Sequence, residues 1–200
     1  MREEFIKAVK KNQSDFQINL SDEKISALAD YYKTIISRND LLHLVAPCAP
    51  EVFAVRHVLE SLTLLEFLPE NAKFADVGAG AGLPSIPCLI VREDLRCVLI
   101  ESSQKKANFL RETIAGLKLF NRAEVIDKQF EEVKKPFADF VTSRALDKFA
   151  KKLPALVKWS GKSRLAFFGG NNLRESLQKL KLDFDEKLTP QSEQRFLFII

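Results

Sequence analysis

Apolar residues in the first third of the chain recur at the three- and four-residue intervals that are typical of helices. Ser21 is suited to cap a helix that starts at Asp22. The buried face of this helix is predicted to carry Ile25, Leu28, Ala29, Tyr32, Ile35 and Ile36. Another helix is expected to start after Pro50, which suits a first helical turn, and to run to Leu68. Residues 1–68 are therefore predicted to form a helical extension that packs on the rest of the protein.

From residue 73 onward, short apolar runs alternate with helical patterns. The predicted strands are Lys73–Val77, Arg96–Ile100, Ala123–Ile126, Ala138–Thr142 and Arg164–Phe168. Helices are expected over Gln104–Leu119, near 147–158 and near 171–181. Such alternation implies right-handed βαβ units and a mostly parallel sheet that is covered by helices on both faces. The last two runs, Leu182–Leu188 and Arg195–Ile200, are predicted to close the sheet as an antiparallel pair.

The location of charge adds to this pattern more than the overall composition does. The 200 residues carry a formal net charge of +4, and 46% of them are hydrophobic, as in an ordinary globular protein. Residues 1–40 and 166–200 are each neutral, residues 41–100 carry −3, and residues 101–165 carry +7. A concentrated basic region suits a polyanionic partner, but lysine and arginine also solvate helix faces. Charge alone leaves both interpretations open.

The cysteines and the apolar stretches indicate where the protein works. Cys48, Cys88 and Cys97 show no C-x-x-C spacing, and the two histidines are far apart, so we expect no metal site. The thiols are typical of buried, reduced cysteines in a cytoplasmic protein. No apolar run approaches the roughly 18 residues of a membrane-spanning helix, and the amino-terminal residues lack a secretory apolar stretch. We therefore expect a cytoplasmic monomer without membrane contact.

A glycine-rich loop is the candidate ligand site. It reads Asp76-Val77-Gly78-Ala79-Gly80-Ala81-Gly82-Leu83-Pro84, and it follows a predicted strand and precedes a helix. Ligands bind open α/β sheets at the carboxyl ends of strands, and glycines there admit positive φ and a close approach. The dinucleotide pattern G-x-G-x-x-G/A fails at Leu83 and Ser85, and the loop lacks the Gly-Lys-Ser/Thr ending of a phosphate-binding P-loop.

The remaining pattern, D-x-G-x-G-x-G, resembles the first motif of the Rossmann-like methyltransferases that use S-adenosylmethionine. An acidic residue is then expected at the end of the next strand, where it accepts hydrogen bonds from ribose hydroxyls. Glu101 follows the run RCVLI and fits this role. The alternative is a tight turn that binds no ligand. The motif predicts the cofactor and is silent about the substrate.

Four segments together narrow the resemblance. They are Arg56–Leu62 (RHVLESL), Asp76–Pro87 (DVGAGAGLPSIP), Glu101–Leu110 (ESSQKKANFL) and Thr142–Ala145 (TSRA). In this order they are similar to the bacterial 16S ribosomal RNA guanine-N7 methyltransferases, the RsmG or GidB family, over roughly residues 30–170. The resemblance implies a Rossmann-like α/β fold with a mostly parallel seven-stranded sheet, and a methyltransferase domain over residues 69–200. It also implies S-adenosylmethionine as cofactor and 16S rRNA or the small ribosomal subunit as partner.

The resemblance implies roles for individual residues. The expected cofactor-binding residues are Gly78, Gly80, Gly82, Leu83, Glu101, Phe130, Glu131 and Arg144, with Phe130 and Glu131 flanking the adenine. The candidate RNA contacts, on the helix after Glu101, are Lys105, Lys106 and Arg111. Plainer alternatives are a surface salt bridge for Arg144, a core position for Phe130 and a solvated face for the basic residues. We expect His43 to be structural and favour a packed or capping role for His57.

Three departures from the family pattern concern RNA contacts and substrate placement more than cofactor binding. His43-Leu44-Val45 stands where the family often has Asn-Leu-Thr, and Phe168 stands where a lysine is common. The loop after Glu101 reads Ser-Gln-Lys-Lys, whereas Leu-Gly-Lys-Arg is usual.

The expected reaction needs little from acid–base chemistry. Guanine N7 has a lone pair and no proton, so in-line methyl transfer requires no general base, and the sequence offers no obvious catalytic His–Asp pair. Catalysis would come from proximity and orientation. Positive charge moves from the sulfur to the base, so a nearby carboxylate or carbonyl could stabilise it. The target base must be unstacked to reach the pocket. Two alternatives remain. One is a small-molecule methyltransferase on the same fold, although no long lid insertion is visible, and the other is a non-catalytic cofactor- or RNA-binding relative.

Overall fold

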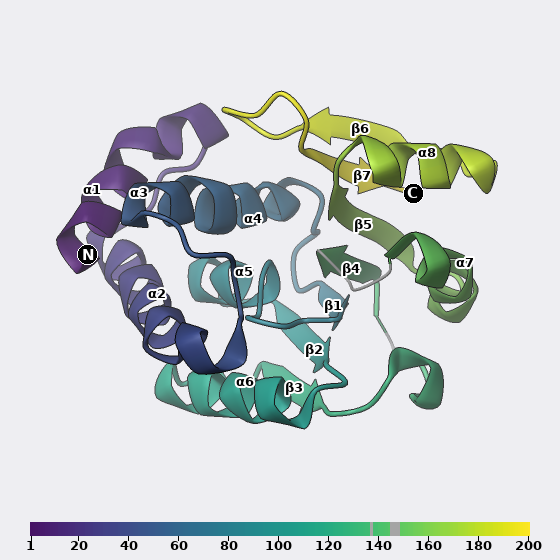
Figure 1. Cartoon of the computed structure of the whole chain (residues 1–200), viewed down its shortest axis with the longest axis horizontal. Helices are drawn as coiled ribbons and strands as arrows, with labels where there is room; N and C mark the ends of the chain where they lie inside the picture. Colours follow the sequence, from purple (N-terminus) through teal and green to yellow (C-terminus); the bar gives the residue numbers. More distant parts are fainter. Residues whose placement is uncertain (137, 145–148) are drawn as a thin grey trace.

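A seven-stranded sheet lies between two groups of helices (Figure 1). The computed structural model describes residues 1–136, 138–144 and 149–200. Along the sheet the strands follow the order β3-β2-β1-β4-β5-β7-β6. Their bounds are β1 Lys73–Val77, β2 Arg96–Ile100, β3 Ala123–Ile126, β4 Phe140–Arg144, β5 Arg164–Gly169, β6 Asp185–Leu188 and β7 Phe196–Ile199. Strands β1 to β5 are parallel, and β7 and β6 close the sheet in antiparallel pairing, which confirms the predicted architecture.

Strand β4 differs from its predicted range of Ala138–Thr142, because it begins at Phe140 and continues to Arg144. Two polar residues in its second half are compatible with a buried strand because both are hydrogen-bonded. The Thr142 hydroxyl donates to the Ala166 carbonyl at 2.7 Å, and the Ser143 hydroxyl donates to the Val77 carbonyl at 2.8 Å. Arg144 is therefore the last residue of the strand and lies at the carboxyl edge of the sheet.

The amino-terminal region is helical, but not throughout. The helices outside residues 50–66 are α1 Arg2–Asn12, α2 Asp22–Leu42, α5 Ser85–Val91, α6 Gln104–Gly116, α7 Phe149–Ser160 and α8 Asn171–Lys179, with 3-10 turns at Gln13–Phe16 and Phe130–Glu132. Ser21 caps α2 as predicted, because its side chain accepts from the Lys24 amide at 3.3 Å. Residues 43–49 form a non-helical segment between α2 and the next helix. Residues 17–21 form a second such connection, so the helices of this region are joined by two short non-helical segments.

The helix that follows this segment changes type along its length. It passes from α3 (Pro50–Phe53) through the π-helix η2 (Ala54–Leu59) and α4 (Glu60–Leu62) to the 3-10 turn η3 (Thr63–Glu66). The predicted plain helix to Leu68 was therefore wrong in type and two residues too long. Short π-helical turns are rare and often occur at functional sites. This π-helix carries Arg56 and His57.

Each face of the sheet is covered by its own hydrophobic cluster, because neighbouring strand residues point to opposite faces. Phe168 belongs to the cluster with α5, α6 and the amino-terminal helices, whereas Phe167 belongs to the cluster with α7 and α8. The first cluster continues without a break into the amino-terminal helices. There the ring of Tyr32 lies 4.9 Å from that of Phe5 and 4.8 Å from that of Phe53. A domain boundary at residue 68 stays a prediction.

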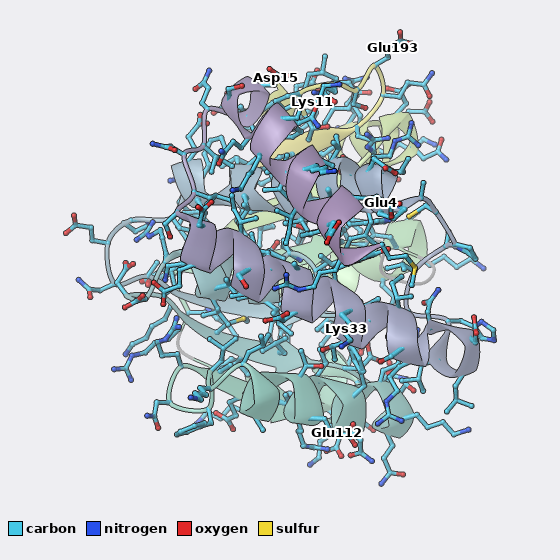
Figure 2. All side chains as sticks on the ribbon, turned by 90° about the vertical axis from the view of Figure 1, so that its left-hand side faces the viewer. Glu4, Lys11, Asp15, Lys33, Glu112 and Glu193 are labelled. Carbon is cyan, nitrogen blue, oxygen red and sulfur yellow. The ribbon has the colours of Figure 1, made fainter. Side chains whose placement is uncertain are left out.

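The outer face formed by α1, α2 and α6 carries charges of both signs (Figure 2). Acidic and basic side chains are interspersed there, among them Glu4, Lys11, Lys33 and Glu112. Mixed charge is typical of a solvated surface and does not favour a polyanion.

The described part of the chain also bears on thiols, metals and membranes. Cys88 and Cys97 are buried, Cys48 is half-buried, and all three are free thiols. Within residues 1–136, 138–144 and 149–200, no group of three His, Cys, Asp or Glu side chains is arranged to hold a metal ion. None of the helices in these residues is long and apolar enough to cross a membrane.

Candidate active site

A cavity of about 500 Å³ lies at the carboxyl ends of the central strands. This volume is within the usual range for a small-molecule site. One wall combines the glycine loop with the ends of β2 and β4 and the start of α6. From the residues predicted for the site, this wall contains Gly78, Gly80, Leu83, Glu101, Lys106 and Arg144. The opposite wall comes from residues 43–46 and from His57 on the π-helix.

The glycine loop has the backbone conformation for which glycine is required. The φ angles are 73° at Gly78, 54° at Gly80 and 91° at Gly82, in a region that other residues rarely adopt. The amides of Gly78 and Ala79 both donate to the Ile100 carbonyl, at 2.8 and 3.2 Å, and tie the loop to the end of β2. Gly82 does not line the cavity, because it packs against Ile86 of α5.

Glu101 is held by the loop and still has capacity to accept hydrogen bonds. Its side chain is buried, with the residue 8% exposed. The Gly80 amide donates to Oε2 at 2.9 Å, and the Ser103 amide donates to Oε1 at 2.8 Å. A carboxylate has about four acceptor positions, so two remain beside the cavity. This arrangement fits the predicted acceptor for two ribose hydroxyls.

Two buried polar residues, Asp76 and Tyr31, form hydrogen bonds within or next to the glycine loop. Asp76 is fully buried at the end of β1, where it accepts from the Ser85 hydroxyl, and burial raises the pKa of its carboxyl group to about 7. Its other oxygen, Oδ1, has no partner among the described residues. Tyr31 of α2 donates its hydroxyl hydrogen to the Ala81 carbonyl at 2.8 Å, and burial raises the pKa of this phenol.

Replacing Tyr31 with phenylalanine is expected to lower the free energy of unfolding by about 1–2 kcal/mol, because the Ala81 carbonyl loses its buried donor. Chemical denaturation measures this change. Tyr32→Phe is the matched control, since Tyr32 is equally buried and its hydroxyl makes no hydrogen bond within the described residues. Equal losses in the two variants would contradict a tether between α2 and the loop.

Arg144 is the cationic group of the cavity wall. Its side chain is 13% exposed and forms an ion pair with Glu60, which is itself 4% exposed, so the salt bridge is a buried one and not the surface pair considered from the sequence. The guanidinium carbon lies 5.5 Å from the centre of the Phe168 ring. Burial lowers the pKa of Arg144, whereas Glu60 raises it. Phe168, one of the departures from the family pattern, thus contacts this arginine directly.

The two histidines are both in the opposite wall of the cavity. The His57 ring lies 4.9 Å from the Phe53 ring, and its buried Nδ1 has no partner among the described residues. Burial and the nearby arginines lower the pKa of His57 to about 4, so its imidazole is neutral at pH 7. His43 ends helix α2 with a φ of 47°. Asn39 then fixes the following segment through two hydrogen bonds of 3.0 Å with the Val45 backbone.

Phe130 and Glu131, which were predicted to flank the adenine, are not among the residues that line the cavity. Phe130 is buried, its ring lies 5.8 Å from that of Trp159, and the Lys152 amine lies 5.9 Å above it. Glu131 is exposed. Gln129 and Lys152, joined by a hydrogen bond of 3.1 Å, line the cavity at this point. Cofactor contacts of Phe130 and Glu131 stay a prediction.

Of the three predicted RNA contacts, Lys106 lines the cavity. Lys105 lies in a separate shallow hollow beside Arg38. Arg111 forms an ion pair of 3.1 Å with Asp127. RNA binding by these residues stays a prediction.

Four residues that matter to the site were missed from the sequence: Tyr31, Glu60, Gln129 and Lys152. Tyr31 could have been found, because it lies three residues after Leu28 on the same helical face. Glu60 is an acidic residue within a run of apolar positions, and this is the usual sign of a buried charge with a partner. Gln129 and Lys152 carry no such local signal.

The strand order, the glycine loop and the acidic residue after β2 together define a methyltransferase that uses S-adenosylmethionine. Solved structures share this fold at low sequence identity. A SAM-dependent methyltransferase from Aquifex aeolicus superposes with a TM-score of 0.57 at 18% identity, covering 85% of this chain and 97% of that one. The ribosomal protein L11 methylase from Lactobacillus delbrueckii gives a TM-score of 0.57 at 14% identity, with 72% and 78% covered.

Within this class, the chain belongs to the GidB family, rRNA small subunit methyltransferase G, whose family model matches residues 24–187. The relative from Acinetobacter baylyi, a ribosomal RNA small subunit methyltransferase G, is 31% identical over 186 residues, which cover 90% of this chain and 86% of that protein. The proteins of the same name from Sorangium cellulosum and Pelotomaculum thermopropionicum are 38% and 40% identical over 70% and 64% of this chain. These alignments span only 61% and 54% of those two relatives.

Proposed function

We propose that this protein transfers a methyl group from S-adenosylmethionine to N7 of one guanine in 16S rRNA, acting as a monomer in the cytoplasm. The observation that carries the proposal is a single cavity that is lined by the glycine loop, Glu101, Arg144 and two lysines. Membership of the GidB family supports the choice of small-subunit rRNA as substrate.

The residues present fit the cofactor. Gly78 and Gly80 line the cavity with backbone alone, only the Gly78 carbonyl lies within 4 Å of a Cβ position on Gly80, and Glu101 offers two acceptor positions to the ribose hydroxyls. Leu83 supplies an apolar surface in the same wall. When bound, S-adenosylmethionine supplies an electrophilic methyl group on a sulfonium centre.

The chain's own residues bind and orient the base. Guanine presents two acceptors, O6 and N7, on the edge that carries N7, whereas adenine presents a donor at N6. We therefore assign Arg144, which the resemblance placed among the cofactor-binding residues, to the guanine edge, because a donor group in the cavity wall favours guanine. No residue has to remove a proton, in keeping with His57, whose pKa of about 4 makes it a weak proton acceptor and whose ring packs against Phe53. Residues 43–46 line the cavity and reduce the contact of a bound base with water.

Lysines at the cavity bind the phosphates on either side of the target nucleotide. Lys106 comes from α6 and Lys152 from α7, so they approach from different elements. Both belong to residues 101–165, which carry a net charge of +7. Binding through them is expected to weaken as the salt concentration rises.

In the test, purified protein and methyl-labelled S-adenosylmethionine are added to small ribosomal subunits and, in parallel, to bare 16S rRNA. Both substrates lack the N7 methyl group. We expect label at a single guanine. Borohydride reduces the ring of N7-methylguanine, and aniline then cleaves the RNA chain at that nucleotide, which identifies its position. Isothermal titration calorimetry with S-adenosylmethionine alone measures cofactor binding independently of rRNA methylation. Cofactor binding without rRNA methylation would support a small-molecule enzyme or an inactive relative, and would contradict the proposal.

A further inference from the structure

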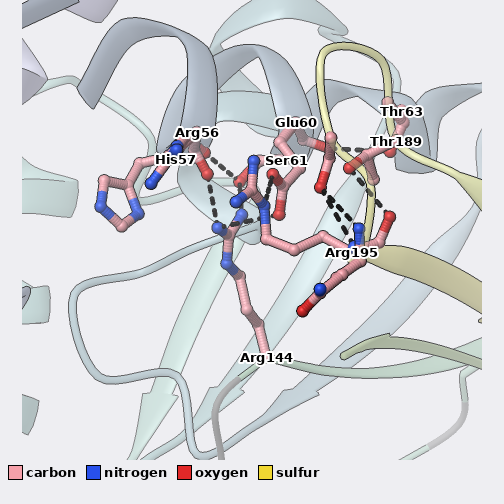
Figure 3. A network of polar contacts seen from close by, with 10 residues as sticks. Arg56, His57, Glu60, Ser61, Thr63, Arg144, Thr189 and Arg195 are labelled. Atoms are coloured by element: carbon pink, nitrogen blue, oxygen red, sulfur yellow. Dashed lines mark hydrogen bonds and ion pairs between the residues drawn. The ribbon is translucent and has the colours of Figure 1, made fainter. Parts of the chain in front are cut away.

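Two arginines share one buried carboxylate next to the cavity (Figure 3). The Glu60 side chain is only 4% exposed. Its Oε1 lies 3.2 Å from Nη2 of Arg144, and its Oε2 accepts from Nε of Arg195 at 2.6 Å. Each carboxylate oxygen therefore binds one arginine. Arg144 is the last residue of strand β4, and Arg195 immediately precedes strand β7.

The helix that carries Glu60 makes two further contacts with the same guanidinium group. Nη2 of Arg144 donates to the Arg56 carbonyl at 2.6 Å, and Nη1 donates to the Ser61 hydroxyl at 3.2 Å. Ser61 in turn donates to the His57 carbonyl. Within the described residues, Nε–H of Arg144 makes no protein hydrogen bond. The contacts thus restrain one side of the guanidinium and leave donors for the cavity that Arg144 lines.

The second arginine is itself fixed by the backbone around it. The Thr189 amide and hydroxyl donate to the Arg195 carbonyl at 2.9 and 3.0 Å, and the Ser192 hydroxyl accepts from the Arg195 amide at 3.1 Å. A half-buried positive charge is therefore held on the far side of Glu60 from Arg144. Without the carboxylate between them, the two guanidinium groups would repel each other, and the repulsion would be poorly screened on the side of the more buried Arg144. Among the described residues, Glu60 is the acidic side chain that forms an ion pair with Arg144.

We propose that Glu60 is a positioning residue for methyl transfer, which holds Arg144 in the orientation that presents its free donors to the guanine base. This inference rests on the proposed function, because it assigns the base to the cavity. A long arginine side chain loses much rotamer freedom when it is fixed, and contacts made before the substrate arrives remove that cost from the reaction. The π-helix contributes because the Arg56 carbonyl is one of these contacts.

Glu60→Gln is the informative substitution, because it keeps the size of the side chain and places an amide NH₂ against a guanidinium, donor facing donor. We expect kcat for rRNA methylation to fall about 10- to 100-fold, since small misplacements of a binding group have effects of this size. The Kd for S-adenosylmethionine is expected to change by less than about 2-fold. Glu66→Gln is the matched control, because Glu66 lies on the same helical stretch, is exposed and pairs with Lys187.

A double-mutant cycle distinguishes an effect of Glu60 on the position of Arg144 from a general effect on the stability of the protein. In an Arg144→Gln background, Glu60→Gln should cost less than about 2-fold in kcat, because its effect passes through Arg144. The same loss in both backgrounds would overturn the proposal. Should the Glu60→Gln protein fail to bind S-adenosylmethionine, Glu60→Asp replaces it in the cycle, because it keeps the buried negative charge while moving the carboxylate.

A second measurement does not depend on activity. In protein labelled with ¹⁵N-arginine, the Nη signals of Arg144 are expected to be resolved, because its contacts slow rotation of the guanidinium group. In Glu60→Gln these signals should average, and unchanged signals would overturn the proposal. If the unmodified protein methylates no rRNA, the proposed function fails, whereas the arginine signals still report whether Glu60 holds Arg144.

Discussion

Replacing Glu101 with alanine is expected to raise the Kd for S-adenosylmethionine by at least about 100-fold. Two hydrogen bonds from ribose hydroxyls to a charged acceptor contribute about 1.5 kcal/mol or more each, and 1.4 kcal/mol corresponds to a factor of ten in Kd. The substitution also removes the acceptor of the Gly80 and Ser103 amides, which lie 2.9 and 2.8 Å from the carboxylate. The loop then loses its fixed position as well as its ligand contact.

Isothermal titration calorimetry measures this loss, and circular dichroism confirms that the variant is folded. Glu112→Gln is the matched control, because Glu112 is an exposed residue of the adjacent helix α6, and its surface contact with Arg38 is expected to contribute little. Unchanged affinity in a folded Glu101→Ala protein would show that the ribose does not bind at this carboxylate.

The strands could be predicted well where an apolar run stands alone between polar residues. The bounds of β1, β2 and β3 were predicted residue for residue. Strand β4 was misplaced because Ser143 and Arg144 do not look like strand residues. Their side chains are satisfied by the Val77 carbonyl and by Glu60, which are distant in sequence. A local pattern cannot show such partners.

The site was predictable where it depends on backbone geometry and not where it depends on tertiary contacts. The glycine pattern and the position of Glu101 after a strand located one wall of the cavity, and the structure brings these residues together. The other wall comes from residues 43–46, whose place is set by Asn39 and by packing of α2 against α1, α5 and α6. The shared carboxylate of Glu60 joins three segments that are far apart along the chain, so no short motif encodes it.

The third glycine of the loop has a steric role that gives the largest expected effect on stability. A Cβ atom on Gly82 would lie 2.4 Å from Cδ1 and 2.8 Å from Cγ1 of Ile86, and 3.2 Å from Cδ2 of Leu110. Ile86 and Leu110 are fully buried, so neither can move aside freely. The φ angle of 91° adds backbone strain for any residue with a side chain.

Gly82→Ala is therefore expected to lower the free energy of unfolding by about 3–5 kcal/mol, the sum of backbone strain and overpacking. Denaturant unfolding with and without S-adenosylmethionine measures the change. Gly116→Ala is the matched control, because nothing lies within 4 Å of a Cβ atom there and the residue ends helix α6. It should raise stability by up to about 1 kcal/mol, since alanine favours a helix over glycine.

A double variant distinguishes the two sources of the Gly82→Ala loss. Ile86→Val removes Cδ1, the atom nearest to the new Cβ, but leaves the backbone angle of Gly82 unchanged. If the clash dominates, Gly82→Ala should cost at least about 1 kcal/mol less in the Ile86→Val background than in the unmodified protein. If strain dominates, the cost should be the same in both. A cost below about 1 kcal/mol in the unmodified protein would contradict both causes, and would mean that the loop adopts another conformation without loss of stability.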